Sequence, residues 1–403
     1  MKTTLPLLAL LSFSCALSLA AAETAVPRFR AVEIDAKIEI GYGVTVADVD
    51  GDKKPDILLV DKNQVVWYQN PTWKKHIIAE NLTKLDHVCI AAQDIDGDGK
   101  CEIAIGAGWN PGDTVNSGAV FYLIPPDDRT QKWEPVELPH EPTVHRMRWL
   151  KDPSSGSYYL VVAPLHGRGN KNGAGEGVKI IAYRNTGTKK EPWKLETVNE
   201  SLHMTHNLEP LLDSGGNARE LLIAGKEGVF WVNLDGSKHL AQHSSNESGG
   251  AGEVRIGKLT GQNWFFATVE PMHGTNLVVY TVPERKATAA DKEKGKFLWD
   301  RHVLDSSLVD GHALACGDLA GLGRDQIVVG WRAMGKKDVK VGIKLFTPLD
   351  AEGKDWKQTL IDDNTMACED LCLADLNGDG RLDVIAAGRA TKNVKIYFNE
   401  GVK

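Results

Sequence analysis

Carboxylate residues recur at a fixed spacing within short glycine-bearing segments of the sequence. In one copy, Asp94, Asp96, Asp98 and Glu102 stand at positions 1, 3, 5 and 9 of such a segment. Alternate carboxylates of a tight turn point inward, and Ca²⁺ prefers oxygen ligands arranged in this way. Two further copies are strong, so the sequence predicts up to three structural Ca²⁺ sites; their residues are Asp48, Asp50, Asp52 and Asp56, and Asp375, Asn377, Asp379 and Asp383.

A second group of residues carries side chains suited to acid–base catalysis. Its members are imidazoles, guanidinium groups and one carboxylate: His145, Arg146, His166, His206, Glu253, His273, His312 and Arg332. β-Elimination beside a carbonyl needs a base, an acid and stabilisation of a developing oxyanion, and these side chains supply all three. Alternatively, a set such as His206, Glu253 and His312 is a ligand set for a divalent ion that acts as a Lewis acid. No Gly-x-Ser-x-Gly elbow is present, so a serine nucleophile is not indicated.

The carboxylate turn belongs to a repeat that occurs seven times. Incomplete copies begin at Asp152, Asp213, Lys258 and Asp318. A short apolar strand precedes each turn and another follows it, and then comes a third strand with β-branched and aromatic alternation, such as residues 394–398. A fourth strand, usually marked by Trp, ends the unit. Four strands make a propeller blade, so the sequence predicts an all-β, seven-bladed β-propeller.

The two ends of the sequence are expected to meet in the last blade. The seventh repeat reaches Lys403 with only three strands, while residues 29–35 have the fourth-strand pattern and precede the first repeat. This N-terminal strand is expected to complete the last blade and to close the ring, which leaves no open sheet edge. Residues 23–403 are therefore expected to form one domain.

This topology sorts the polar residues between two faces. All carboxylate turns lie on one face, whereas the loops that enter the first strand and leave the second strand lie on the other, here called the rim face. Six of the twelve histidines map to the rim face. Substrate contacts are expected there from Tyr42, His87, Trp109, Asn207, Trp331, Glu369 and Arg389. The convergence favours a functional centre over a polar, water-filled funnel, and substitutions in a wet channel are expected to change stability little.

The repeat resembles the FG-GAP or VCBS repeat family, whose units build propeller blades. Several strings also resemble the propeller domain of aldos-2-ulose dehydratases, enzymes that eliminate water from 1,5-anhydro-fructose; they are Thr205-His206-Asn207, Glu270-Pro271-Met272-His273-Gly274 and Asp310-Gly311-His312-Ala313-Leu314. The resemblance implies a carbon–oxygen lyase that acts on a keto-sugar.

Composition and the first residues bear on location and partners. The net charge of −7 argues against a nucleic-acid partner. Residues 1–22 contain Lys2, an apolar run and a final Ala-Ala-Ala, which is the layout of a secretory signal peptide, so a secreted or periplasmic protein is expected. No later segment reaches the roughly 18 apolar residues of a membrane span.

Five cysteines follow the predicted cleavage site. They are Cys89, Cys101, Cys316, Cys368 and Cys372. We expect small core residues, with Cys89–Cys101 or Cys316–Cys372 bridges as the alternative.

Three classes of function agree with the sequence. The first is a secreted lyase or dehydratase acting on a small carbohydrate or an oligosaccharide, with ulvan-type polysaccharide lyases as the nearest variant. The second is a non-catalytic carbohydrate- or protein-binding FG-GAP propeller, and the third is a redox or cofactor propeller. A lyase is expected to contain buried histidines in a deep channel, whereas a binding module is expected to expose repeated aromatic pockets. The rim residues differ from blade to blade, which favours the lyase.

Overall fold

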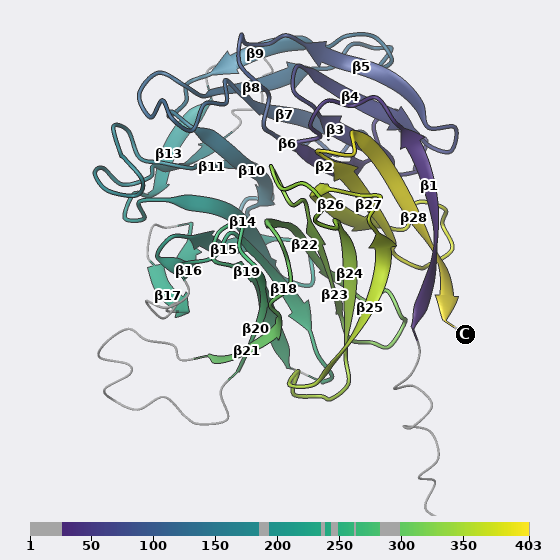
Figure 1. Cartoon of the computed structure of the whole chain (residues 1–403). Helices are drawn as coiled ribbons and strands as arrows, with labels where there is room; N and C mark the ends of the chain where they lie inside the picture. Colours follow the sequence, from purple (N-terminus) through teal and green to yellow (C-terminus); the bar gives the residue numbers. More distant parts are fainter. Residues whose placement is uncertain are drawn as a thin grey trace, which may run out of the picture.

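Seven four-stranded antiparallel sheets surround a common centre (Figure 1). The computed structural model describes residues 26–184, 193–234, 238–242, 249–261, 263–282 and 299–402, with 238–242 described by their backbone alone. The predicted signal peptide, residues 1–22, lies outside these ranges. The described residues form twenty-eight strands and no helix, so none of them belongs to a helix that could cross a membrane.

Each blade is contiguous in sequence except the last. The first six blades are β2 (Gly43–Ala47), β3 (Asp56–Val60), β4 (Gln64–Gln69) and β5 (Lys74–Glu80); β6 (Cys89–Gln93), β7 (Glu102–Ala107), β8 (Ala119–Ile124) and β9 (Glu134–Leu138); β10 (Val144–Lys151), β11 (Tyr158–Pro164), β12 (Ile180–Arg184) and β13 (Lys194–Asn199); β14 (Thr205–Leu212), β15 (Ala218–Gly225), β16 (Gly228–Asn233) and β17 (Lys238–Gln242); β18 (Glu253–Lys258), β19 (Trp264–Glu270), β20 (Asn276–Thr281) and β21 (Asp300–Asp305); β22 (Gly311–Gly317), β23 (Gln326–Trp331), β24 (Gly342–Pro348) and β25 (Trp356–Asp363). The seventh contains β26 (Cys368–Ala374), β27 (Asp383–Gly388), β28 (Asn393–Val402) and β1 (Pro27–Asp35).

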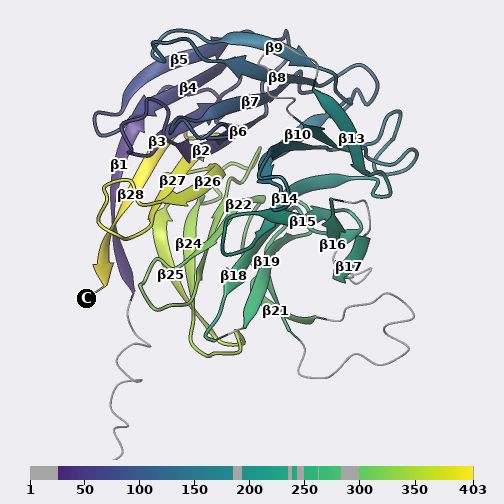
Figure 2. The ribbon, with the colours of Figure 1, turned by 180° about the vertical axis from the view of Figure 1, so that it is seen from behind.

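The N-terminal strand closes the ring, as the sequence predicts. Strand β1 pairs with β28 in antiparallel register from Pro27↔Val402 to Asp35↔Val394. The two strands lie side by side in the ribbon, and the view from behind shows the same pairing (Figure 2). The seven-bladed, all-β prediction is therefore confirmed.

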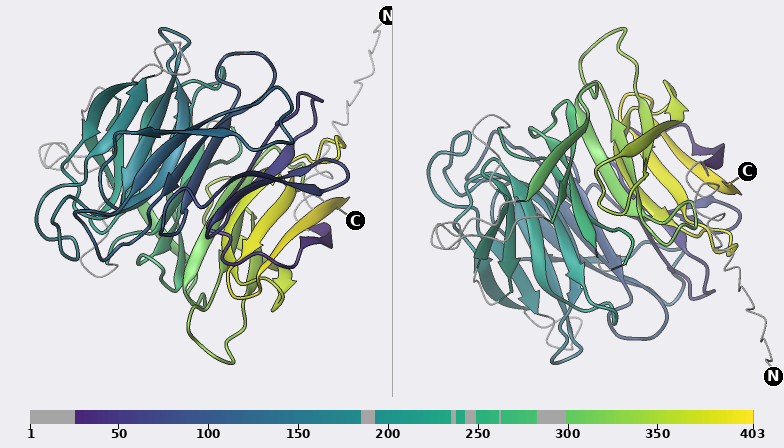
Figure 3. Two further views of the ribbon diagram at one scale, coloured as in Figure 1. Left: turned by 90° about the horizontal axis from the view of Figure 1, so that it is seen from above. Right: turned by 90° about the horizontal axis from the view of Figure 1, so that it is seen from below.

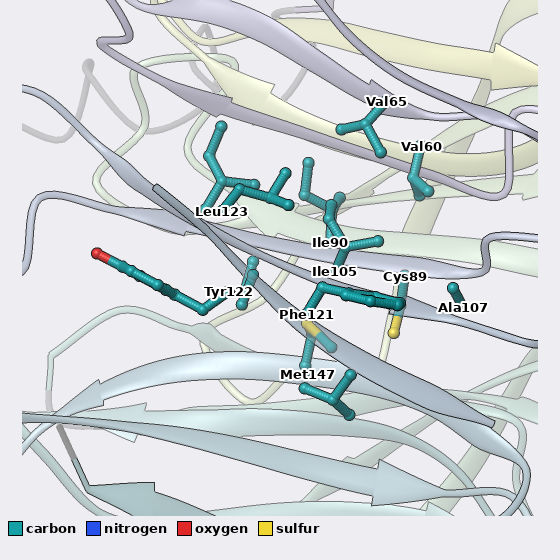
Figure 4. Close-up of a cluster of buried hydrophobic side chains, with 14 of the residues drawn as sticks. Val60, Val65, Cys89, Ile90, Ile105, Ala107, Phe121, Tyr122, Leu123 and Met147 are labelled. Carbon is teal, nitrogen blue, oxygen red and sulfur yellow. The ribbon is translucent and has the colours of Figure 1, made fainter. Parts of the chain in front are cut away.

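The core consists of apolar side chains packed between neighbouring blades. Second strands are mostly buried, and β3 and β7 are buried along their whole length, because both faces of each sheet contact another blade. Figure 4 shows one part of this packing, where Ile90, Ile105 and Phe121 of the second blade meet Val60 of the first and Met147 of the third. Burial of apolar surface between blades is the main source of stability in a ring of packed sheets.

The cysteines of the described ranges form no disulfide bond. All five are free, and Cys89, Cys101 and Cys368 are buried. Cys89 lies within the packing between blades shown in Figure 4. The expectation of small core residues is confirmed, and both alternative bridges are wrong.

The first strands of the blades lie nearest the centre, and they position the residues expected to have function. The Asp-rich turns join first to second strands, so they lie at one end of the ring, and the loops before each first strand lie at the other end. Figure 3 shows the same ring in two further views, each turned by 90° from Figure 1.

Candidate functional site

A cluster of histidines stands where the innermost strands begin. His145 belongs to β10, His206 to β14 and His312 to β22, and each lies at a register shift of its strand, between Val144 and Arg146 in the first case. A β-bulge leaves one residue unpaired and re-aims its side chain. Glu369 occupies the same kind of bulge in β26. The bulges thus direct side chains of four blades toward one place.

One ring nitrogen of each strand histidine is held by the next blade. Nδ1 of His145 donates to the carbonyl of His206 at 2.9 Å, and Nδ1 of His206 donates to the carbonyl of Gly252 at 2.7 Å. Nδ1 of His312 donates to the carbonyl of Glu369. A carbonyl can only accept, so each neutral ring carries its proton on Nδ1 and has a lone pair on Nε2. The fold therefore fixes the tautomer of all three rings.

His273 reaches the same place from a different element. It follows β19 in a loop, has a positive φ of 54°, and is more exposed than the strand histidines. Its Nε2 lies 2.7 Å from Nε2 of His206. Because the Nε2 of neutral His206 is an acceptor, His273 is the donor in this contact. The ring centroids of His273 and His312 are 5.0 Å apart.

Burial keeps the strand histidines neutral. Burial and the neighbouring Arg146 hold the pKa of His145 and of His206 well below the ordinary value. Burial and Arg332 do the same to the pKa of His312. His206 is only 2% exposed and His312 only 4%. The two rings are therefore almost fully buried and do not line an open, wet channel, while the small effect of their replacement on stability stays a prediction.

The cluster extends to other residues that the sequence singled out. The Trp109 ring stacks on His145 with centroids 4.8 Å apart. Nη1 of Arg146 donates to Nε2 of His145 at 3.1 Å. Glu253 lies beneath His206, and its Oε1 is 3.3 Å from Nδ1 of that ring. Its Oε2 accepts a hydrogen bond from the side-chain amide of Asn207.

Arg332 is held by carboxylates rather than being free for a substrate. Its Nε lies 2.9 Å from Asp310 and its Nη1 lies 2.7 Å from Glu369. Burial opposes its charge, but Glu369 and Asp310 outweigh burial and raise its pKa. Arg389 also contacts Glu369, at 2.9 Å, and lies over the ring of Tyr42. This network braces the wall of the site next to His312.

Among the described residues, three members of the predicted rim set form no hydrogen bond or ring contact with the histidine cluster. His87 is fully buried and its Nε2 accepts the Leu82 amide, so it lies below the loops. Trp331 packs in the core between the fifth and sixth blades, and its indole N–H donates to the carbonyl of Lys340. His166 is 7% exposed, and within the described chain its Nδ1 has no hydrogen-bond partner. In the sequence, a position at the end of a strand did not distinguish these three side chains from those of the histidine cluster.

The ligand geometry of the histidine cluster suits a divalent ion. Ligand atoms of His206, His273 and His312 all lie within 4.8 Å of one another. A tetrahedral zinc-class site separates its nitrogens by about 3.3 Å, so the 2.7 Å contact between His206 and His273 must widen when an ion binds. The fixed Nδ1–H bonds are the outer contacts that orient metal-binding imidazoles. The residues present therefore fit such an ion.

The three Asp-rich turns share one hydrogen-bond pattern. In the second turn Asp94 accepts the amides of Gly97 and Gly99, and Glu102 accepts the amide of Ile95. Equivalent bonds are made in the first turn by Asp48 and Asp56, and in the third by Asp375 and Asp383. These carboxylates stabilise the turns by accepting hydrogen bonds from backbone amides, whether or not they also bind a metal ion.

The turns differ in how their carboxylates converge. Ligand atoms gather within 4.8 Å in the sets Asp48, Asp50 and Asp56 and Asp94, Asp96 and Glu102. Burial raises the pKa of Asp56 and of Glu102 to about 7, a shift that a cation would reverse. Asp52 instead pairs with Lys54, and Asp98 lies 3.9 Å from Arg129. In the third turn Asp379 pairs with Arg381 and also accepts from Asn377.

Sequence reasoning missed several residues that shape the site. Asp310 contacts Arg332 and has a positive φ of 59°. Arg148, Glu209, Arg255 and Asp370 line the channel below the histidines. The sequence feature that could have identified them is alternation, because charged residues at every second position of an innermost strand point toward the ring centre.

Comparison with known proteins agrees with this description. The family model "Aldos-2-ulose dehydratase, beta-propeller domain" matches residues 117–283, and that of an FG-GAP-like repeat matches residues 48–105. The first range contains His145, His206 and His273, whereas His312 lies beyond it; the second range contains two of the Asp-rich turns. No curated protein matches the chain significantly in sequence.

Solved structures share the fold at low identity. The chain is similar to one in the crystal structure of the mitotic checkpoint complex, with 12% identity, a TM-score of 0.57 and coverage of 98% of this chain and 99% of the other. It is similar to BBS1N in complex with ARL6DN, with 12% identity, a TM-score of 0.54 and coverage of 93% and 97%. The Cps50 (Swd1) propeller of Myceliophteria thermophila has 10% identity, a TM-score of 0.53 and coverage of 92% and 99%.

Fold and site thus define a seven-bladed β-propeller with FG-GAP-like repeats. Within that class the chain resembles the propeller domain of aldos-2-ulose dehydratase.

Proposed function

We propose that this protein is a carbohydrate-active lyase or dehydratase that performs β-elimination on a keto-sugar such as 1,5-anhydro-fructose. The observation that carries the proposal is the convergence of His206, His273 and His312 from three elements, with two of the rings fixed through Nδ1. The resemblance of residues 117–283 to a dehydratase propeller supports the same chemistry. Buried, mutually contacting histidines are expected of a catalytic centre rather than of a repeated binding surface.

The chain's own residues can account for the proton movements. A neutral imidazole takes the proton next to the substrate carbonyl through its Nε2 lone pair, and the electron pair moves into the new double bond as the C–O bond breaks. His273, which carries an Nε2 proton in its contact with His206, donates to the departing hydroxyl, so water leaves and no oxidant is needed. Arg146 has no carboxylate partner within 4.0 Å in the described chain, so its charge remains for the developing oxyanion.

A divalent ion held by the three histidines belongs to the same proposal. It would polarise the substrate carbonyl as a Lewis acid. In that state the imidazoles would serve as ligands, and Glu253, whose Oε1 lacks a hydrogen-bond partner among the described residues, would remain as a base. We also propose structural Ca²⁺ in the Asp48–Asp56 and Asp94–Glu102 turns, where the carboxylates converge.

The test is the formation of a conjugated product. The full-length protein is incubated with 1,5-anhydro-fructose, and in parallel with uronate polysaccharides, and ultraviolet absorbance of the new enone or unsaturated uronate is followed. Product from the first substrate alone supports the dehydratase, and product from the second alone supports the ulvan-type variant. Absence of product from both, with the metal supplied, refutes elimination on these substrates and favours the non-catalytic binding propeller.

Export of the protein is a separate proposal, based on residues 1–22. N-terminal sequencing of the protein recovered outside the cytoplasm should give a start near Glu23.

A further inference from the structure

The central channel contains a second compartment below the histidine cluster. It is a cavity of about 370 Å³, lined by residues from the innermost strands of all seven blades. Arg146 lies at the boundary between the cavity and the histidine cluster, since it lines the cavity and also contacts His145. The volume falls within the range of small-molecule sites, which are roughly 300–1,000 Å³.

Charged side chains at one level of the ring face this cavity. Arg148 of β10, Glu209 of β14 and Arg255 of β18 occupy equivalent places in three consecutive blades. Arg255 has two carboxylate partners, because its Nε lies 3.8 Å from Glu209 and its Nη1 lies 3.8 Å from Glu253. Both contacts are long for ion pairs, so the guanidinium retains donors that face the cavity.

Arg148 is the least compensated charge of the compartment. Its Nη1 donates to the carbonyl of Met147 at 2.8 Å, and no carboxylate of the described chain lies within 4.0 Å of it. Burial, and then Arg255, lower its pKa from the ordinary value. Arg148 is half-buried, and a guanidinium that is partly removed from water with only a carbonyl partner costs free energy unless an anion accompanies it.

The acids of the cavity do not cancel this charge. Oδ2 of Asp370 accepts the amide of Val44 at 2.9 Å. Burial raises the pKa of Asp370 and of Glu209. With Arg146, Arg148 and Arg255 opposed by these two acids alone, the lining has a positive excess.

We propose that this compartment is a binding site for a small oxyanion, held by the guanidinium groups of Arg148 and Arg255. Guanidinium groups match the paired oxygens of carboxylate, sulfate and phosphate. Trp149 adds an aromatic wall, and its indole N–H is already used by the carbonyl of Ala91, so its ring offers an apolar surface. The site therefore suits either an inorganic oxyanion or a sugar acid whose ring packs on Trp149.

The test is calorimetric titration of the full-length protein at constant ionic strength. The ligands are sulfate, phosphate and glucuronate, with glucose as the uncharged control for the sugar. At least one oxyanion should bind with one-to-one stoichiometry, and glucose should not compete with it. Tighter binding of glucuronate would identify the sugar-acid form of the ligand, and equal or tighter binding of sulfate or phosphate would identify the inorganic form.

Variants locate the site. Arg148→Met should weaken oxyanion binding at least about tenfold, because a charge-assisted hydrogen bond is lost. Arg148→Lys keeps the positive charge but lacks the planar guanidinium group, so its affinity for the oxyanion should lie between those of the wild type and of Arg148→Met. This variant also tests the proposal if Arg148→Met does not fold. Arg30→Met, on the exposed face of β1, is the matched control and should bind as the wild type does. Unchanged affinity in both Arg148 variants, or no oxyanion binding at millimolar concentration, would overturn the proposal.

Discussion

Replacing His206 by Ala separates catalysis from stability. The change removes the hydrogen bond to the Gly252 carbonyl and the contact with His273. One lost hydrogen bond, with a buried carbonyl left unpaired, costs about 1–3 kcal/mol of unfolding free energy. This is less than the roughly 5–15 kcal/mol of a typical domain, so the variant should remain folded. Turnover should nevertheless fall at least about 100-fold, as is usual for the loss of an acid or base.

The assay is enone formation per folded protein, with the folded fraction taken from chemical denaturation of the same sample. His302→Ala is the matched control, because His302 lies half-buried on the outer strand β21, where its Nε2 forms a hydrogen bond with the Thr281 hydroxyl at 3.3 Å. It should keep activity near wild type. His76, also on an outer strand, is a poorer control because it is buried and stacks on Trp67. The reasoning fails if His302→Ala is as damaging as His206→Ala, or if activity follows the folded fraction alone.

Three further outcomes are expected. Chelation by EDTA should lower the melting temperature reversibly, because an ion that binds only the folded state stabilises it, and Asp96→Ala should reproduce part of the loss; an unchanged melt in both experiments means metal-free turns. Deletion through Asp35 should destabilise strongly, since it removes β1 and uncovers β28; a truncated protein that melts like the whole one contradicts the ring closure. Acidification below about pH 6.5 should reduce the unfolding free energy, because burial lowers the pKa of His87 and the unfolded chain therefore takes up the proton first. In denaturation curves measured at several pH values, His87→Gln should reduce the dependence of the unfolding free energy on pH. The same dependence in the variant and the wild type would rule out His87 as its source.

The fold was predictable because its local signals agree with one another. The Asp-Gly turns, the apolar strands on either side of them and the alternating third strands repeat with enough regularity to count the blades. Even the ring closure follows from the pattern of residues 29–35, since the last repeat lacks a strand.

The site was predictable in location but not in detail. Loop position correctly brought His145, His206, His273 and His312 to one place. Which residues turn inward depends on β-bulges, and the residues around a bulge carry no local mark in the sequence. Trp331 follows the same positional rule, yet it packs into the core between the fifth and sixth blades, because burial of a large aromatic ring outweighs its place at a strand end.

The pairing of β1 with β28 has a consequence for assembly of the chain. Six blades form from neighbouring residues, but the seventh joins Asp35 to Val394, and closing a loop of that length costs about 5 kcal/mol of chain entropy. Packing of the first six blades brings the two ends together and offsets this cost, so β1 docks last. Until then β28 presents an unpaired edge, and the β1 strand of a second copy fits it equally well. Refolding at high protein concentration should therefore divide the chains between closed monomers and strand-exchanged oligomers.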